Sequence, residues 1–142
     1  MKGHKAMKYM LMLHYGADVG EGCEQPIHTW PPADIKAHID FMLRLNKDLT
    51  ESGELVAAEG LAGPEQAKVV RAKKGGAPAI TDGPFPESKE LLAGFWIVDC
   101  DGPQRAVEIA AKASAAPGPG GIQMSIPIEV RQVMSGPPED AV

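Results

Sequence analysis

The stretch AGFWIVDCDGPQRAVEIAAKA, residues 93–113, contains a strand and a helix joined by a short turn. Its first eight residues, 93–100, include the run FWIV and predict a strong strand, because aromatic and β-branched residues favour extended backbone. The next residues predict a helix start, with Asp101 as N-cap, Pro103 in the first turn and Gln104 completing a capping box. The apolar residues expected to face the core from this helix are Val107, Ile109, Ala110 and Ala113.

Glycine and proline mark the end of this strand–helix unit. The cluster APGPGG, residues 116–121, ends the helix because proline cannot continue it. A final strand is predicted over residues 124–134, in which Pro127 requires a sheet edge or a bulge. The alternating apolar side chains expected on one face of this strand are Met124, Ile126, Ile128 and Val130. Residues 135–142 are predicted to form a flexible tail.

A second strand–helix pair precedes the first. Residues 9–15 are almost continuously apolar, which is typical of a strand buried on both faces or lying at the centre of a sheet. A long loop rich in glycine, proline and acidic residues follows over 16–32, and loops of that length are often functional. Two prolines then open a helix, predicted over 34–52 and stopped by Gly53. The apolar face of this helix is expected to contain Ile35, Ile39, Met42, Leu45 and Leu49.

Three short strands are predicted between the two units. They occupy residues 54–58, 67–72 and 78–81, and KKGG at 73–76 has the composition of a hairpin turn. The connector TDGPFPESKE, residues 81–90, leads into the next strand. The order β, α, β, hairpin, β, α, β predicts an α+β fold of the ferredoxin-like split βαβ type. Helices would cover one sheet face only, so we expect a homodimer that buries the open sheet face.

Composition narrows the classes of protein to which the chain can belong. A chain of 142 residues with 44% hydrophobic and 23% charged residues is typical of one globular domain. The net charge of −5 argues against a nucleic-acid-binding protein, which normally carries a basic surface. No apolar run approaches the roughly 20 residues of a membrane span, so no membrane partner is expected.

The N-terminal residues favour a cytoplasmic protein. MKGHKAMKYMLMLHYG has a short apolar run and no small-residue cleavage site, so we do not predict a signal peptide. Residues 1–7 are instead predicted to be a flexible tail. The two cysteines, Cys23 and Cys100, are expected to be reduced thiols and have no zinc-ligand spacing.

Four segments resemble the DGPF-domain proteins, a branch of the YCII-related superfamily. The most specific is TDGPFPESKELLAGFWIVD at residues 81–99. It is accompanied by KYMLMLHYG at 8–16, SGELVAAEGL at 52–61 and IEVRQVM at 128–134, so the resemblance covers residues 8–134 in the same order.

The resemblance implies a dimeric α+β barrel built from ferredoxin-like protomers. Most such proteins have no known biochemical role, and some are linked to alternative sigma factors. A relative in the wider superfamily is a dehydrochlorinase of a chlorinated hydroxyquinol, which resembles a His/Asp acid–base enzyme. In such enzymes the histidine lies about three helical turns before the glycine that ends the first helix. Met42 occupies that neighbourhood here, and His38 lies one turn earlier on the same helical face.

His38 and Asp82 are the candidate catalytic residues. Asp82 precedes Gly83-Pro84, a pair that forces a sharp turn, and the carboxylate would either cap that turn or be presented into a cleft. In the second case it would orient a histidine or bind a substrate hydroxyl. His38 lies near the apolar face of the first helix, where it is either a hydrogen-bonded boundary residue or a general acid–base group.

Five further residues are candidates for binding the substrate. They are His14, Tyr15, Phe85, Lys89 and Glu90. Alternatives remain for several of them: Tyr15 also suits the edge of the core, Phe85 suits a plug that anchors its loop, and Lys89 with Glu90 suits a solvated ion pair. His28 and Trp30 lie in the long loop, where they are candidates for a lid.

Two hypotheses follow for function. The first is a cofactor-independent acid–base enzyme acting on a small, hydroxylated or aromatic compound through His38 and Asp82. The second is a non-catalytic ligand-binding or regulatory dimer associated with transcription, in line with the sigma-factor linkage that the resemblance implies. No metal site is predicted, because His14, His38 and Asp82 fall in no local metal-binding pattern, and no phosphate or dinucleotide loop is present.

Overall fold

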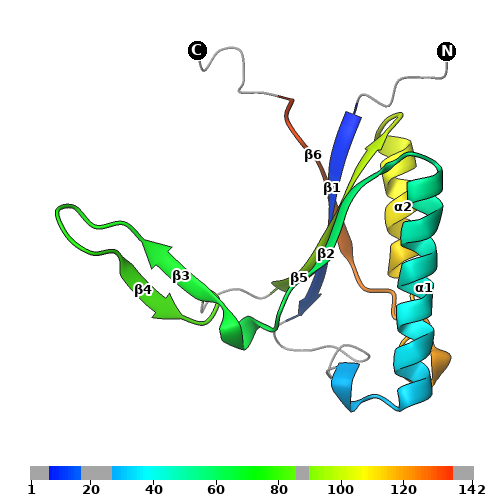
Figure 1. Cartoon of the computed structure of the whole chain (residues 1–142), viewed down its shortest axis with the longest axis horizontal. Helices are drawn as coiled ribbons and strands as arrows, with labels where there is room; N and C mark the ends of the chain where they lie inside the picture. The colour runs from blue at the N-terminus through cyan, green and yellow to red at the C-terminus, as the bar shows by residue number, and fades with distance from the viewer. Residues whose placement is uncertain (1–6, 17–26, 86–89, 136–142) are drawn as a thin grey trace.

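A four-stranded antiparallel sheet and two helices form the body of the protein (Figure 1). The computed structural model describes residues 7–16, 27–85 and 90–135. The strand order in the sheet is β2-β5-β1-β6. These strands span Leu55–Gly60 (β2), Glu90–Cys100 (β5), Met7–Gly16 (β1) and Ile128–Gln132 (β6), and the helices span Pro32–Glu51 (α1) and Pro103–Ser114 (α2).

The chain alternates between sheet and helices as predicted. β1 and β2 are joined through α1 and have β5 between them, while β5 and β6 are joined through α2 and have β1 between them. Both helices lie on the same side of the sheet (Figure 1). The α+β prediction, the split βαβ order and the inner position of the first strand are therefore confirmed.

The core lies between the two helices and the sheet. Strand β1 pairs with β5 so that Tyr9 faces Val98 and Leu11 faces Trp96, and these four side chains are buried beneath the helices. From the helices, the buried residues are Leu45, Leu49, Ala106, Ile109, Ala110 and Ala113. Three of the four buried residues of α2 are alanine, and these small side chains allow the helix to pack close to the sheet.

The other face of the sheet has no helix over it. Because side chains alternate along a strand, this open face carries Met10 and Met12 of β1 opposite Ile97 and Phe95 of β5. All four side chains are half-buried. The open face therefore presents a largely apolar centre.

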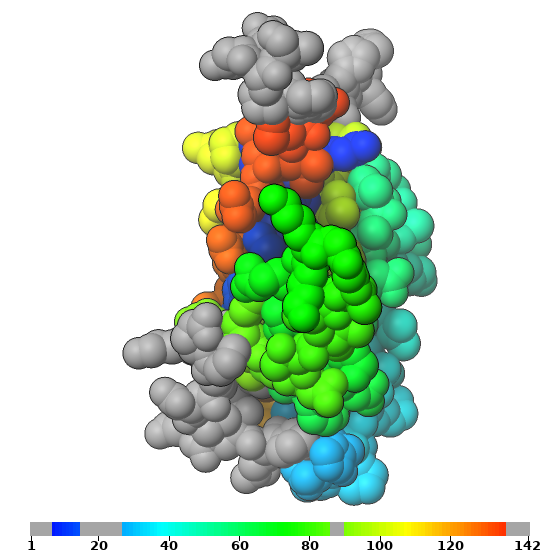
Figure 2. Space-filling model, turned by 90° about the vertical axis from the view of Figure 1, so that its left-hand side faces the viewer, coloured from blue at the N-terminus to red at the C-terminus, as the bar shows by residue number. Residues whose placement is uncertain are grey.

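A two-stranded arm projects from the body on the open-face side. It consists of β3 (Lys68–Arg71) and β4 (Ala79–Asp82), which pair only with each other among the described strands. Figure 2 views the molecule from this side, with the arm (green) in front of part of the sheet. The predicted hairpin turn is present, and Gly75 has the positive φ of 68° that such turns need.

The end of α1 agrees with the prediction from the sequence, and the start of α2 differs from it. Gly53 follows α1 with φ 80°, the left-handed conformation that stops a helix. The predicted cap at Asp101 is wrong: the N-cap residue of α2 is Gly102, which makes no side-chain cap hydrogen bond. The reason is that α2 begins directly at Pro103, which places the aspartate one residue too early.

Two predicted core residues are exposed. Val107 of α2 is 57% exposed and Ile39 of α1 is 45% exposed. In α2 the buried stripe passes through Ala106 instead, three residues before Ile109, so the valine lies beside the stripe rather than in it.

The last strand is shorter than predicted. β6 begins at Ile128, whereas the expected strand began four residues earlier. Ser125 has φ 54°, a left-handed conformation that interrupts extended backbone. Met124 and Ile126 are consequently outside the sheet and face the cavity described below.

One buried carboxylate is fully paired. Glu54, at the start of β2, is 7% exposed and accepts two hydrogen bonds of 2.9 Å from the Arg105 guanidinium of α2. Ser52 donates a third at 2.7 Å. The pair ties the end of α1 to the start of α2, and hydrogen bonding to Glu54 raises the pKa of Arg105.

Within the described ranges, no helix is long and apolar enough to cross a membrane.

Candidate functional site

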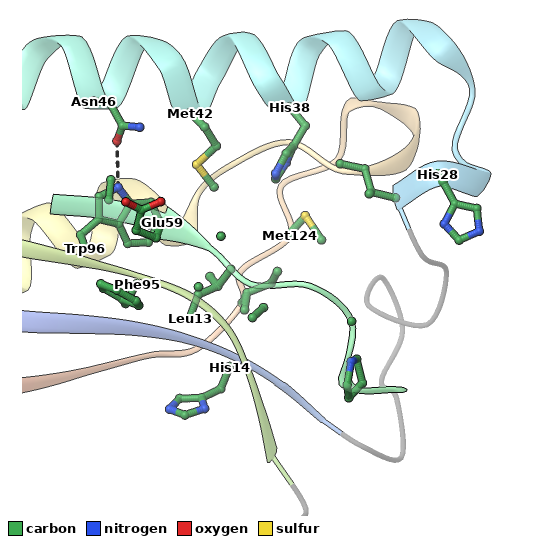
Figure 3. Close-up of a pocket in the computed structure, with 18 of the residues that line it drawn as sticks. Leu13, His14, His28, His38, Met42, Asn46, Glu59, Phe95, Trp96 and Met124 are labelled. Atoms are coloured by element: carbon green, nitrogen blue, oxygen red, sulfur yellow. Dashed lines mark hydrogen bonds between the residues drawn. The ribbon is translucent and has the colours of Figure 1, made fainter. Parts of the chain in front are cut away.

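A cavity of about 870 Å³ lies between α1 and the end of the sheet. Its size is within the usual range of small-molecule sites. Its apolar walls come from five parts of the chain: Leu13, Trp30, Met42, Phe95, Trp96, Met124 and Ile126. Figure 3 shows the cavity with α1 above and the sheet below.

Helix α1 contributes a row of three side chains to the cavity. His38, Met42 and Asn46 are spaced four residues apart and therefore lie on one helical face. All three point from α1 towards the sheet in Figure 3. The row places a histidine at one end, a thioether in the middle and an amide at the other end.

The ring of His38 is fixed by two contacts. Its Nδ1 lies 3.0 Å from the carbonyl oxygen of Pro117, and the ring meets Trp30 edge-on with 5.5 Å between ring centroids. A carbonyl oxygen only accepts hydrogen bonds, so Nδ1 carries the proton and the neutral ring keeps a lone pair on Nε2. His38 thus presents an acceptor, and a base, to the cavity.

The amide of Asn46 is oriented by Trp96. The indole N–H of Trp96 donates to Asn46 Oδ1 at 2.8 Å, and because an indole nitrogen is only a donor, this bond distinguishes the amide oxygen from the nitrogen. The Asn46 NH₂ group then lies on the side nearer Met42 (Figure 3). The far end of the row is therefore a hydrogen-bond donor.

Two paired glycines leave room below the row. Gly60 of β2 faces Gly94 of β5 across the sheet, in register with positions that face the helices. A Cβ at Gly94 would lie 2.8 Å from the backbone oxygen of Glu59, so a side chain is excluded there. A Cβ at Gly60 would meet no atom within 4 Å.

The charges around the cavity are all acidic. Glu59 and Glu65 contribute to its lining, and neither lysine nor arginine is present among the described residues that line it. The described part of the lining therefore offers no lysine or arginine to bind a carboxylate or phosphate.

Asp82 lies away from His38 in this chain. It ends β4 on the projecting arm, where its carboxylate accepts from Lys68 at 2.7 Å and its side chain is 84% exposed. It does not line the cavity. The group that orients His38 is the carbonyl of Pro117, the role for which Asp82 was a candidate.

The predicted substrate-binding residues are dispersed. His14 is at the cavity edge but lies on the side of β1 away from α1 (Figure 3), where its Nε2 is 3.0 Å from Glu129 Oε1. Tyr15 pairs with Leu91 in the β1–β5 ladder.

The described residues of the connector do not converge on the cavity either. Phe85 is 54% exposed and Glu90 begins β5 at the surface, and neither lines the cavity. Lys89 lies outside the described residues. His28 and Trp30 do line the cavity, and Trp30 is buried as part of its wall. A lid movement of these two residues remains a prediction.

Comparison with known proteins shows the family of this chain. The YCII-related domain family matches residues 7–126. The chain belongs to this family. A protein of Rhizobium meliloti (strain 1021), described as uncharacterized, is 31% identical over 93 residues, which cover 66% of this chain and 74% of that protein.

The described part of this YCII-related chain contains no group of three or more His, Cys, Asp or Glu side chains placed to bind a metal ion. The site is instead an apolar cavity with a few fixed polar groups.

Sequence reasoning missed most of the cavity lining. Asn46 had a detectable signal, because it is a polar residue four positions after Met42 on an apolar helical face. Trp96 was assigned only to a predicted strand, and its indole N–H bond was not predicted. Pro117 had no signal, because it acts through a backbone carbonyl that every residue possesses.

Proposed function

We propose that this YCII-related protein binds a small, uncharged, ring-containing compound in the cavity, and that His38 transfers a proton to and from it without a cofactor. The observation that carries the proposal is the Nδ1–Pro117 bond, which leaves Nε2 of His38 as a base in an apolar, partly enclosed site. Aromatic and thioether walls favour flat apolar ligands.

The proton-transfer step uses groups that are present. Nε2 takes a proton from an acidic O–H or C–H of the substrate, and the bonding electron pair stays on the substrate. The imidazolium that forms keeps its Nδ1–H bond to Pro117, whose carbonyl dipole stabilises the positive charge. The proton then returns to the substrate or to solvent, which restores the neutral ring.

Substitution of His38 tests this function. In His38→Asn the amide NH₂ keeps a donor near Pro117, while the Nε2 base is lost. Deuterium incorporation at the ring carbons next to the hydroxyl of 5,6,7,8-tetrahydro-2-naphthol in D₂O, followed by NMR, measures base catalysis, because removal of the hydroxyl proton places negative charge on those carbons. We expect wild type to accelerate exchange and His38→Asn to lose about 100-fold or more of that acceleration. Equal rates with both proteins would contradict a catalytic role.

A non-catalytic ligand-binding dimer is the second candidate. It is favoured by the His38 environment, since the only hydrogen bond described for its ring goes to a backbone carbonyl rather than to a second acid or base. Binding of 5,6,7,8-tetrahydro-2-naphthol without any His38-dependent exchange would support this candidate over the enzyme.

We also propose that two copies pack through the open sheet face. Its centre is apolar, with Met12 opposite Phe95 and Met10 opposite Ile97, and large apolar patches favour partners. The arm lies on the same side and carries four basic residues and one acidic residue over 68–82 in a chain of net charge −5, so its charge complements a second copy.

Sedimentation measurements test the dimer. We expect wild type to sediment with twice the chain mass and Met12→Glu to sediment as a monomer, because a carboxylate would be buried without a partner in the interface. Val107→Glu, on the exposed side of α2, is the matched control and should remain dimeric. A monomeric wild type would contradict the proposal.

A further inference from the structure

The two polar ends of the α1 row have opposite hydrogen-bonding characters. His38 Nε2 accepts, because Nδ1 is committed to Pro117 as a donor. The Asn46 NH₂ donates, because its oxygen is committed to Trp96, and no acceptor for that NH₂ is found among the residues that the structure describes. A ligand that satisfies both ends needs a donor group at one end and an acceptor group at the other.

The spacing of the two residues sets the length of the ligand. Eight residues separate His38 from Asn46, which corresponds to about 12 Å along the helix axis. Met42 lies between them and offers no strong hydrogen-bonding group. The middle of the ligand is therefore apolar and about the size of two fused rings.

The walls and charges restrict the ligand further. Trp96 lines the cavity from β5 and Met124 lines it from the segment before β6, which suits a flat aromatic body. The two glutamates, with no described lysine or arginine in the lining, disfavour an anion.

We infer that the cavity selects uncharged, elongated aromatic compounds that carry a hydroxyl at one end and a carbonyl at the other. The hydroxyl donates to His38 Nε2, and the carbonyl accepts from the Asn46 NH₂. This inference rests on the proposed function and adds the second anchor, Asn46, together with the polarity and length of the ligand.

Four compounds with one bicyclic skeleton test the two anchors separately. They are 6-hydroxy-2-tetralone with both groups, 2-tetralone with the carbonyl, 5,6,7,8-tetrahydro-2-naphthol with the hydroxyl, and tetralin with neither. Dissociation constants are measured by ligand-observed NMR. Each hydrogen bond is expected to tighten binding about fivefold, so the doubly substituted compound binds tightest. The anion 6-hydroxy-2-naphthoate is expected to bind more weakly than 6-hydroxy-2-tetralone.

Asn46→Asp is the decisive variant. Aspartate keeps an oxygen that accepts from Trp96 and replaces the NH₂ donor with a second acceptor oxygen, so the bond to Trp96 is kept and the carbonyl anchor is lost. We expect the advantage of 2-tetralone over tetralin to disappear in Asn46→Asp, while tetrahydronaphthol binds as in wild type. His38→Asn should give the reverse pattern. Thermal melting of both variants verifies folding.

The outcomes separate the inference from the proposed function. Equal binding of all four compounds to wild type would overturn the inference and leave ligand binding in place. Unchanged carbonyl preference in Asn46→Asp would overturn the assignment of Asn46. Binding of none of the four would overturn the proposed function and the inference together.

Discussion

Nδ1 of His38 lies 3.0 Å from the carbonyl oxygen of Pro117, 79 residues later in the chain. The bond joins α1 to the turn between α2 and β6, and it determines which ring nitrogen of the neutral histidine carries the proton. Histidines in catalytic and metal sites are commonly oriented by a backbone carbonyl in this way. The chemistry available at the cavity depends on this single backbone contact.

We predict that neutral His38 is the Nδ1–H tautomer. Long-range ¹H–¹⁵N correlation spectra distinguish the two tautomers from the ring nitrogen shifts. The same spectrum is expected for Asp82→Asn, because Asp82 is paired with Lys68 on the arm. An Nε2–H tautomer would contradict the orientation of the base.

Removal of the Asn46 oxygen is predicted to destabilise the protein. Asn46→Leu leaves the indole N–H of buried Trp96 without its acceptor, which costs about 1–3 kcal/mol in the free energy of unfolding. Urea unfolding of Asn46→Leu, Trp96→Phe and the double variant forms a mutant cycle. We expect the double variant to cost less than the sum of the two single changes. Strict additivity would show that the bond contributes nothing.

Loss of the Arg105 guanidinium should lower the free energy of unfolding more than loss of a surface cation does. Arg105→Met removes both guanidinium hydrogen bonds from the buried Glu54 carboxylate, and we expect a loss of about 3 kcal/mol in the free energy of unfolding. Lys36→Ala is the control, because the Lys36–Asp40 pair is exposed and worth about 0.5 kcal/mol or less. Chemical unfolding of both variants gives the comparison, and similar losses would refute the structural role of Glu54.

Cys100 should resist thiol reagents in the folded protein. Burial raises the pKa of its thiol above the ordinary value of 9.0, so the folded state disfavours the thiolate. In a Cys23→Ser background we expect a colorimetric disulfide reagent to react only after unfolding. Rapid reaction of the native protein would contradict the buried position.

The same thiol gives a pH dependence of stability. Because the pKa is raised in the folded state, its contribution is constant below about pH 9 and is lost as the pH rises above that value. The free energy of unfolding of wild type should therefore fall more steeply there than that of Cys100→Ala. The difference in slope is at most about 1.4 kcal/mol per pH unit. Identical slopes for the two proteins would contradict this expectation.

The sequence predicted the body of the fold because its signals were local and agreed with one another. Apolar periodicity placed the first helix within two residues of Pro32–Glu51, and Gly53 ends it with the expected left-handed conformation. The separation of β3 and β4 from the main sheet was not predicted, because a hairpin pattern determines its own pairing and not the sheet that it joins. The early end of the last strand depends on the φ of Ser125, which its residue type does not reveal.

The site was predicted less completely than the fold. His38 was identified from its place on an apolar helical face, and it does line the cavity. Its partner depends on how two loops are folded, which no local pattern encodes. The connector 81–90 was predicted to contribute to the site because of its composition, but its described residues do not line the cavity.

Of the two facing glycines, Gly60 can be replaced by a larger residue that makes the cavity smaller, and Gly94 cannot. Residue 94 is confined to glycine by the backbone oxygen beside it, whereas residue 60 has space for larger side chains. A change from glycine to alanine, valine or leucine at residue 60 would shorten the cavity stepwise without disturbing His38, Asn46 or the sheet register. Variants at residue 60 would therefore differ in the length of the ligand they accept while His38 and Asn46 stay in place.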